Sequence, residues 1–432
     1  MKYTKNSGDI AVSHWDDDDF KPSQREALHE DQKLCKWNLD RIVSTVPLKI
    51  QSSGICNGSG LFAGADIPAG REIYHVAPIM HTLSAGNPSF CSHCLKDTQE
   101  VLGGPSKDNE ETKACANCKV ARFCSKRLVG YAFDVVTAMI NHSCDPNAFV
   151  HFEGNEIRVR SLRPIAAGEE ITICYIDPTL RLTARKDFLK GNHFFDCSCT
   201  RCEGELKEQS SLLEGTEKLS ILPHYQREIV RLIDAAVQAF KHPGVFPDYE
   251  DPSAVETLLR TVTTHAFPPG KLWPEHMEPL PSARLSLAKL YLGKGQPVPA
   301  LRNGLKGKLL NTRKSGPEWV NEMMDIITIL IVAGSLPPES PAFQDKKFPS
   351  ATDLQNVTLG YFVAATHEAA RMFGPEAEYA KGISHMTSVM GAQREPPLPG
   401  SKEFIEVFIP AQRRLLEWVG IPEENAIAIH GV

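Results

Sequence analysis

The sequence predicts an α+β protein in which a β-rich, cysteine-containing half is followed by an all-α half. All but one of its twelve cysteines lie between residues 56 and 202, where glycine and proline turns separate short β-like runs. From about residue 206 onward, apolar residues recur at three- and four-residue steps, as they do in amphipathic helices. We therefore expect a polar, partly disordered region at 1–45, a β-rich domain at 46–205 and a helical domain at 206–432.

Two runs in the β-rich half have the pattern of strands. Glu156–Arg160 alternates charged and apolar side chains, as a half-buried strand does. Ile171–Tyr175 follows it after the turn-forming stretch RPIAAGEE and is expected to be a second strand. Short strands joined by tight turns indicate a compact β-rich domain.

The second half has the pattern of a series of helices. The first runs through Tyr225 and Phe240 and is expected to end at Pro243 and Gly244. Antiparallel helix pairs of this kind resemble a TPR-type array, although no clean repeat of about 34 residues is present. Further helical patterns cover residues 253–266, 281–293, 298–312, 317–333, 352–373, 376–391 and 402–419.

Composition narrows the class of protein. The net charge of −6 gives no electrostatic basis for wholesale nucleic-acid binding. The N-terminus has no apolar segment of a secretory signal, and the longest apolar run, at 326–334, is too short to cross a bilayer. We expect a soluble protein of the nucleus and/or cytoplasm with no membrane contact. In such a compartment, CxxC and CxC spacings favour metal binding over disulfides.

The most specific segment is Asn141–Asn147, with the sequence NHSCDPN. Its Asp-Pro pair and its asparagines favour a tight, non-helical turn, so a polar loop with an incidental thiol is the simplest interpretation. Two later segments argue against that interpretation: GEEITICY at Gly168–Tyr175 and FDCSCTRC at Phe195–Cys202.

The second of these segments predicts a metal site. Cys197, Cys199 and Cys202 supply three thiols, one fewer than a tetrahedral structural zinc site requires. Cys144 is the natural fourth ligand, because it lies in a rigid turn and no other nearby site competes for it. Such a Zn²⁺ site would clamp the end of the β-rich domain onto the NHSCDPN loop.

Taken together in this order, these motifs resemble the SET domain with its cysteine-rich post-SET segment, here 195–205. NGSGLFA at Asn57–Ala63 and DIPAG at Asp66–Gly70 are similar to the opening of that domain. The CxxC pairs that follow, in an insert at 91–126, resemble a MYND zinc finger. The combination resembles the SET-and-MYND family of protein lysine methyltransferases, which also carries a helical, TPR-like C-terminal domain.

The resemblance implies a transfer of a methyl group from S-adenosylmethionine to a lysine ε-amine of a histone or another protein. The opening turn, with Gly58, Ser59, Gly60 and Leu61, would let the backbone approach the methionine part of the cofactor. An ordinary hairpin turn is the alternative for that short motif.

Further cofactor contacts and the reaction centre follow from the same family pattern. Asn141 and His142 would hold the cofactor's amino-acid and adenine parts. Tyr175 would stand at the mouth of the lysine channel, where it contacts the cofactor and orients the methyl group and the amine. Phe195 would cover the adenine. Asn147 and Glu170 are expected to brace the loops, and of the fifteen histidines only His142 has a motif around it.

The MYND-like insert departs from the family pattern. The family needs eight ligands for two zinc ions, whereas here the finger ends after Cys124, with Leu128 where a sixth cysteine should stand. Two possibilities remain: an insert without metal, or one ribbon-like zinc site. The ligands of that single site would be Cys91, Cys94, Cys115 and Cys118.

The same junction also lacks most of the helical SET insert, because only sixteen residues separate Cys124 from Asn141. Three functions are therefore weighed. The first is an active lysine methyltransferase. The second is a catalytically inactive SET fold that acts as a zinc-binding interaction module and binds protein partners through its helical domain. The third, DNA binding through the cysteine-rich segment, is disfavoured by the acidic balance and the lack of a basic helix.

Overall fold

A computed structural model describes residues 39–40, 42–55, 58–83, 113–114, 122–123, 130–154, 156–214, 218–268, 271–392, 397 and 401–429. The chain divides into two compact units. The first comprises Met1–Ser44 and His75–Met139, and the second comprises Thr45–Tyr74 and Ile140–Val432.

The described part of the first unit consists of short elements. Strands β5 and β8 pair antiparallel, as do β6 and β7. Helix α2 begins after Asp134, whose carboxylate accepts a hydrogen bond from the Thr137 amide (3.0 Å) and so caps the helix. The elements are β1 (Val43–Ser44), β5 (Met80–Leu83), β6 (Lys113–Ala114), β7 (Arg122–Phe123), β8 (Gly130–Phe133) and α2 (Val135–Ala138).

The second unit contains the β-rich core. Strand β2 pairs with β3, β11 lies between β4 and β10, and β9 pairs parallel with β12. Gly154, at φ 61°, turns the chain between β10 and β11, a conformation that glycine adopts without strain. The strands are β2 (Leu48–Ser52), β3 (Ser59–Ala63), β4 (Glu72–Val76), β9 (Asn141–His142), β10 (Ala148–Glu153), β11 (Glu156–Ser161) and β12 (Thr172–Ile173).

The predicted strand at 156–160 is confirmed by β11. The strand predicted over 171–175 is shorter, because only Thr172 and Ile173 pair with β9. The Ile171 amide donates instead to the Leu61 carbonyl (2.7 Å), and the Tyr175 amide donates to the ring of His142 (3.0 Å).

Helices make up the remainder of the second unit, and the predicted helical segments are confirmed to within a few residues. The longer helices are α3 (Leu182–His193), α4 (Thr200–Leu212), α5 (Lys218–Lys241), α6 (Pro252–His265), α7 (Leu280–Gly293), α8 (Pro297–Leu309), α9 (Pro317–Gly334), α11 (Ala351–Phe373), α12 (Glu378–Ala392) and α13 (Lys402–Val419). Shorter turns are η2 (Pro247–Tyr249), α10 (Pro341–Gln344) and η3 (Glu423–Asn425). The boundary predicted at residue 205 stays a prediction, and α4 runs through it.

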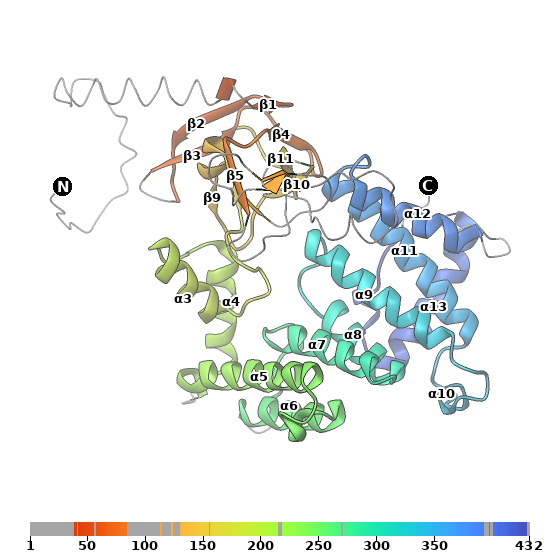
Figure 1. Ribbon diagram of the computed structural model, residues 1–432. Helices are drawn as coiled ribbons and strands as arrows, with labels where there is room; N and C mark the ends of the chain where they lie inside the picture. The colour runs from red at the N-terminus through yellow and green to blue at the C-terminus, as the bar shows by residue number, and fades with distance from the viewer. Residues whose placement is uncertain are drawn as a thin grey trace, which may run out of the picture. The chain divides into compact units, whose positions relative to one another are not determined.

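Successive helices pack against one another: α7 against α8, α8 against α9, and α11 against α9, α12 and α13 (Figure 1). One apolar core runs through them. Helices α11 and α13 pack closely at Gly360, where a Cβ would lie 2.1 Å from the Phe408 ring. The fold class predicted from the sequence, a β-rich domain followed by an all-α domain, is confirmed. Within the described residues, no helix is both long and apolar enough to span a membrane.

The last turn of α11 joins the helices to the β-rich core. The Arg371 guanidinium donates to the Leu162 carbonyl (2.8 Å), and the Phe373 ring packs edge-on against Phe149 of β10 at 5.7 Å between ring centroids. These contacts place the end of a core helix directly against the sheet, and so fix the helices relative to the β-rich core of this unit.

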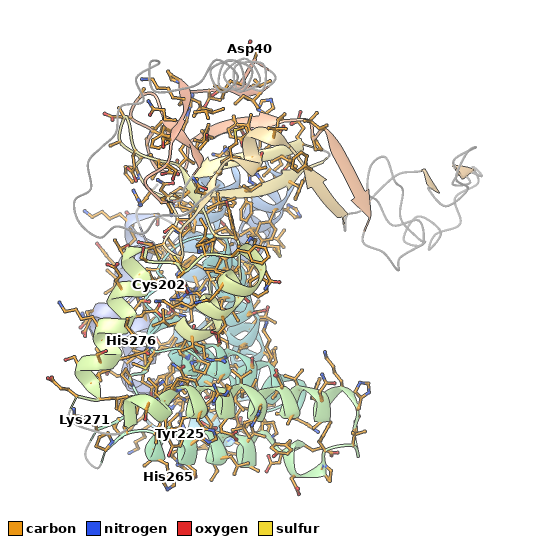
Figure 2. All side chains as sticks on the ribbon, turned by 90° about the vertical axis from the view of Figure 1, so that its left-hand side faces the viewer. Asp40, Cys202, Tyr225, His265, Lys271 and His276 are labelled. Atoms are coloured by element: carbon orange, nitrogen blue, oxygen red, sulfur yellow. The ribbon has the colours of Figure 1, made fainter. Side chains whose placement is uncertain are left out.

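Helix α4 is also tied to the segment before α7. The Lys271 ammonium donates to the Leu212 carbonyl at the end of α4 (2.7 Å), and His276 lies 2.6 Å from the carboxylate of Glu208. Figure 2 shows Lys271 and His276 beside the helices below Cys202. The helix that carries Cys202 is therefore anchored at its far end.

Glu278 provides a pH-dependent test of this helical packing. Its carboxyl group is buried, which raises its pKa from 4.5 to about 7 even with Arg313 3.9 Å away. Between pH 4.5 and 7 the folded state therefore holds a proton that the unfolded state has lost, so stability falls as pH rises. We expect Glu278→Gln to remove this fall, with a gain of at most about 3 kcal/mol at pH 7.5.

Urea unfolding of both proteins at pH 5 and pH 7.5 measures the effect of Glu278→Gln. The exposed Glu376, changed to Gln, is the matched control and should leave the pH dependence as in the unaltered chain. Equal pH dependence in the Glu278→Gln variant and the unaltered chain would contradict the prediction.

Candidate functional site

The site is built on two interlocked loops, Asn141–Asn147 and Gly168–Tyr175. Asn147 is 1% exposed and its side-chain amide joins them. Its oxygen accepts from the Thr172 amide (2.8 Å), while its nitrogen donates to the Glu170 carbonyl (2.8 Å) and to the Glu169 carboxylate (3.0 Å). The predicted bracing role of Asn147 therefore agrees with its contacts.

Glu170 links the same loops to the opening segment of the β-rich core. Its carboxylate accepts hydrogen bonds from the Ser53 hydroxyl (2.8 Å) and from the side-chain nitrogen of Asn141 (2.6 Å). The Asn141 amide also donates to the Ser59 carbonyl (3.2 Å). A Cβ on Gly60 would lie only 2.2 Å from the Glu170 carboxylate, so this close approach requires glycine at position 60. Gly60 of the opening motif thus makes room for the side chain of Glu170.

His142 connects this region to Tyr175. The Tyr175 amide donates to Nδ1 of His142 (3.0 Å), which makes Nδ1 an acceptor and places the ring hydrogen on Nε2. Nε2 lies 3.2 Å from the Cys144 sulfur, to which it donates. Both ring nitrogens are therefore used within the chain, and the ring is only 3% exposed. Any contact of His142 with a cofactor would have to use its backbone or the face of its ring.

Aromatic rings surround Tyr175. The ring centroid of His142 lies 5.2 Å from that of Tyr175 and 5.8 Å from that of Phe195. The Tyr175 hydroxyl donates to the Ile140 carbonyl, which fixes the direction of the phenol. The ring of His193 lies 5.1 Å from Tyr175 and 6.4 Å from Phe195.

Sequence reasoning missed His193, which was grouped with the ordinary histidines. The only available signal was its position two residues before Phe195. The structure places it in the ring cluster because α3 ends at His193 and Phe194 then turns the chain through a left-handed conformation (φ 62°).

A cavity of about 410 Å³ opens beside these loops, within the size range of small-molecule pockets. His142 and Phe195 line it, together with the acidic side chains Asp145, Glu169 and Glu170. Gly58–Leu61, Asn141 and Tyr175 are not among its lining residues. Leu61 has a fully buried side chain, whereas Gly58 and Ser59 are exposed.

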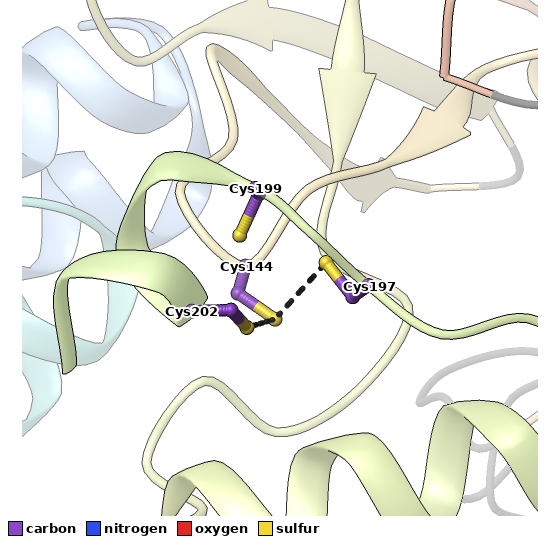
Figure 3. A group of neighbouring side chains, drawn as sticks. All are labelled: Cys144, Cys197, Cys199 and Cys202. Atoms are coloured by element: carbon purple, nitrogen blue, oxygen red, sulfur yellow. Dashed lines mark hydrogen bonds between the residues drawn. The ribbon is translucent and has the colours of Figure 1, made fainter. Parts of the chain in front are cut away.

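Next to the loops, four cysteine sulfurs lie together (Figure 3). Cys144 is 4.0 Å from Cys197 and 3.5 Å from Cys202, and all four sulfurs, with that of Cys199, lie within 4.8 Å of one another. A tetrahedron with Zn–S bonds of about 2.3 Å has S···S edges of about 3.8 Å, so the cluster has the dimensions of a zinc site. The structure thus brings together the four residues that the sequence predicted.

Donors around the cluster suit thiolates. The fully buried guanidinium of Arg185 lies 3.7 Å from the Cys202 sulfur and pairs with Glu205 at 2.8 Å. Because Nε2 of His142 donates to Cys144, the sulfurs of both Cys144 and Cys202 have N–H donors beside them, as ligands in metal sites commonly do. Hydrogen bonding with Cys144 lowers the pKa of the Cys199 thiol, whereas the same cluster raises the pKa of the Cys144 thiol. No sequence pattern pointed to Arg185, because this arginine lies outside the cysteine motifs.

The remaining predicted ligands, Cys91, Cys94, Cys115 and Cys118, lie outside the described residues, as does Asn57 of the opening motif. The contacts of Gly58, Ser59, Gly60, Leu61, Asn141, His142, Tyr175 and Phe195 with a cofactor stay predictions.

Comparison with known proteins identifies the domain to which these loops belong. A family model described as the SET domain matches residues 58–176, which include both loops. This chain contains a SET domain. The region is 35% identical over 117 residues to the mouse histone-lysine N-methyltransferase SMYD3, and 35% identical over 115 residues to the N-lysine methyltransferase SMYD2-B of Xenopus laevis. A SET and MYND domain-containing protein of Dictyostelium discoideum is 42% identical over 78 residues.

These matches confirm the resemblance to SET-and-MYND proteins over the SET domain. The match to SMYD3 covers 27% of this chain and 27% of that relative, and the match to SMYD2-B covers 26% of each. The chain thus matches only about a quarter of the length of these relatives.

Proposed function

We propose that this protein is an S-adenosylmethionine-dependent protein lysine N-methyltransferase. The observation that carries the proposal is the pair of interlocked loops in the SET domain, which holds Tyr175 directly against His142 (Tyr175 amide to Nδ1, 3.0 Å). The named relatives are histone-lysine and N-lysine methyltransferases, so the substrate class proposed here is a lysine side chain of a histone or another protein.

The residues around the cavity fit the proposed cofactor. S-adenosylmethionine, when bound, supplies a methyl group on a positively charged sulfonium. Phe195 offers an aromatic face for an adenine. The lining has four acidic residues, Asp145, Glu169, Glu170 and Asp196, against one cation, Arg163, which pairs with Glu169 (2.9 Å), so the cavity carries the charge opposite to a sulfonium. Asn141 and the Gly58–Leu61 backbone do not line this cavity, so their proposed contacts with the cofactor rest on the sequence motifs alone.

Tyr175 would hold the reacting groups in line. Its phenol is fixed by the hydrogen bond to Ile140, and its ring is packed by His142 and His193. A fixed phenol can orient a neutral amine and exclude water from it, and the alignment of reactants is a large contribution to the rate of such a displacement. His193, exposed beside Tyr175, would form part of the rim that a substrate side chain passes.

The four-cysteine cluster would hold a structural Zn²⁺ through Cys144, Cys197, Cys199 and Cys202. This ion would join the NHSCDPN loop to the segment that carries Phe195, and so keep the cavity wall in place. A second zinc at Cys91, Cys94, Cys115 and Cys118 is proposed from the sequence alone. We also propose residence in the nucleus and/or the cytoplasm, protein partners at the helical domain, and no direct binding of nucleic acid or membrane.

Calorimetry with zinc-loaded protein and S-adenosylmethionine tests the proposal, followed by transfer of labelled methyl groups to a protein extract. Binding and labelling of lysine are expected. Absence of cofactor binding by folded, zinc-loaded protein would overturn the proposal. Binding without turnover would favour the inactive interaction module, which the short interval between Cys124 and Asn141 motivates.

Removing the Tyr175 hydroxyl should lower the methyl-transfer rate far more than it lowers the affinity for the cofactor. We expect Tyr175→Phe to lower the methyl-transfer rate by about a hundredfold while cofactor affinity changes less than about threefold, because the ring and its packing remain. Single-turnover transfer and calorimetry measure the two quantities. Tyr225→Phe, on helix α5, is the matched control and should leave the rate unchanged. Full activity of Tyr175→Phe would remove Tyr175 from the reaction centre.

A further inference from the structure

After α13, the chain turns back and lies along the helix it has just left. Gly420 ends α13 in a left-handed conformation (φ 76°), and the turn η3 follows at Glu423–Asn425. Ala426 is extended (φ −61°, ψ 145°), and residues 426–429 belong to no helix or strand. We refer to Asn425–Ile429 as the return segment.

A single buried side chain holds the backbone of the return segment. The Gln412 amide donates to the Ile427 carbonyl (3.0 Å), and its oxygen accepts from the Ile427 amide (2.8 Å). Gln412 lies on α13 and is 3% exposed. It therefore pairs with one residue of an extended chain as the edge of a β-strand would, through backbone groups that every residue but proline offers.

Side chains of the return segment alternate between the domain and solvent. Asn425, Ile427 and Ile429 are partly buried, whereas Ala426 and Ala428 are exposed. Ile427 and Ile429 pack against the helical core. Lys314 adds one hydrogen bond to the Asn425 side chain (3.2 Å). We call the surface that the return segment covers beside Gln412 the Gln412 groove. Its contacts suit an extended backbone with apolar side chains two positions apart.

The groove is incompletely filled by this segment. A cavity of about 790 Å³ remains between the return segment and the surface of Trp319, Val363, Ala364, His367 and Arg371. The return segment is held by the two hydrogen bonds between Gln412 and the Ile427 backbone, one hydrogen bond from Lys314 to Asn425, and the apolar contacts of Ile427 and Ile429. Exchange of this segment for another of the same pattern would leave the helical core itself intact.

We propose that the Gln412 groove is a peptide-binding site of the helical domain, occupied in cis by the return segment. The partner it fits is a protein segment in extended conformation with aliphatic residues at alternate positions, as in Ile427-Ala428-Ile429. The cis segment competes with that partner at high effective concentration, so the site is self-occluded until the segment is displaced. This binding site is independent of methyl transfer.

The test uses the full chain and a fluorescent peptide of the sequence Glu423–Ile429. The double variant Ile427→Asp/Ile429→Asp removes both apolar anchors and should release the cis segment. We expect this variant to bind the peptide at least about tenfold more tightly than the unaltered chain does, by fluorescence anisotropy. Adding Gln412→Ala to the released variant should weaken binding at least about tenfold. A peptide with proline at position 427, which lacks the amide donor, should bind as poorly.

The matched control is Ala426→Asp/Ala428→Asp, which adds the same two charges on the exposed side of the segment. It should bind the peptide no better than the unaltered chain. The proposal is overturned if the released variant, folded by circular dichroism, fails to bind, or if the control variant binds equally well. Concentration-dependent dimers of the unaltered chain that disappear in the released variant would instead assign the groove to a second copy, and would overturn the assignment to a partner.

Hydrogen exchange on the unaltered chain tests the same site without any substitution, should the released variant not fold. Excess peptide should accelerate exchange of the amides at 426–429 severalfold while those of α13 remain protected. No change at saturating peptide would overturn the proposal.

Discussion

Cys144→Ser is expected to destabilise the second unit by at least about 5 kcal/mol. Structural zinc in finger peptides contributes about 10 to 16 kcal/mol, and one lost thiolate removes much of that contribution. Two of the other sulfurs, those of Cys197 and Cys202, are buried, so without the ion their thiolates would be held close together with no cation between them. The loss should be largest where the NHSCDPN loop meets the segment after residue 195.

Zinc content by mass spectrometry of the metal and urea unfolding measure this effect. Zinc content should fall by one ion per chain in the variant, and a chelator should bring the unaltered chain to the same stability. Cys174→Ser is the matched control, because the Cys174 sulfur lies outside the cluster and donates only to the Ile176 carbonyl (3.1 Å). Unchanged zinc content in Cys144→Ser would show that the cluster is not a metal site.

The sequence was informative wherever spacing alone decides the geometry. Cys197, Cys199 and Cys202 lie so close along the chain that a shared site is nearly unavoidable. Helical periodicity located α5 to α9 and α11 to α13, because each of these helices buries one face in a common core. The alternation in β11 similarly reflects one buried face, with Ile157 and Val159 inside.

Contacts that depend on the direction of a single side chain could not be predicted from the sequence. Nothing in the spacing shows that Glu170 faces Gly60, or that His142 joins Cys144 to the Tyr175 amide. The return segment has only the weak pattern Ile-Ala-Ile, and its role depends on Gln412, which in the sequence looks like any polar residue on a helix. Such contacts join residues that are far apart in the sequence, so they depend on the tertiary fold and not on local sequence patterns.

Asn147→Ala is expected to cost about 3 to 5 kcal/mol. Alanine would leave the Thr172 amide and the Glu170 carbonyl without their partner, and each buried polar group left unpaired costs about 1 to 3 kcal/mol. Release of Glu169 and a small cavity add to the cost. Because the two loops then separate, the Tyr175 amide should lose its hydrogen bond to His142. Cofactor binding should therefore weaken along with stability.

The acceptor and donor roles of Asn147 can be separated with a second substitution. Asn147→Asp keeps the oxygen that accepts from Thr172, but sets a carboxylate against Glu169, so it should be about as destabilising as alanine. Lowering the pH to 4 should recover part of the stability of Asn147→Asp and none of that of Asn147→Ala, since only the aspartate can be neutralised. Asn192→Ala, at an exposed site on α3, is the control. Equal urea midpoints for Asn147→Ala and the control would show that the loops are held together by their β9–β12 pairing, and that the amide of Asn147 is dispensable.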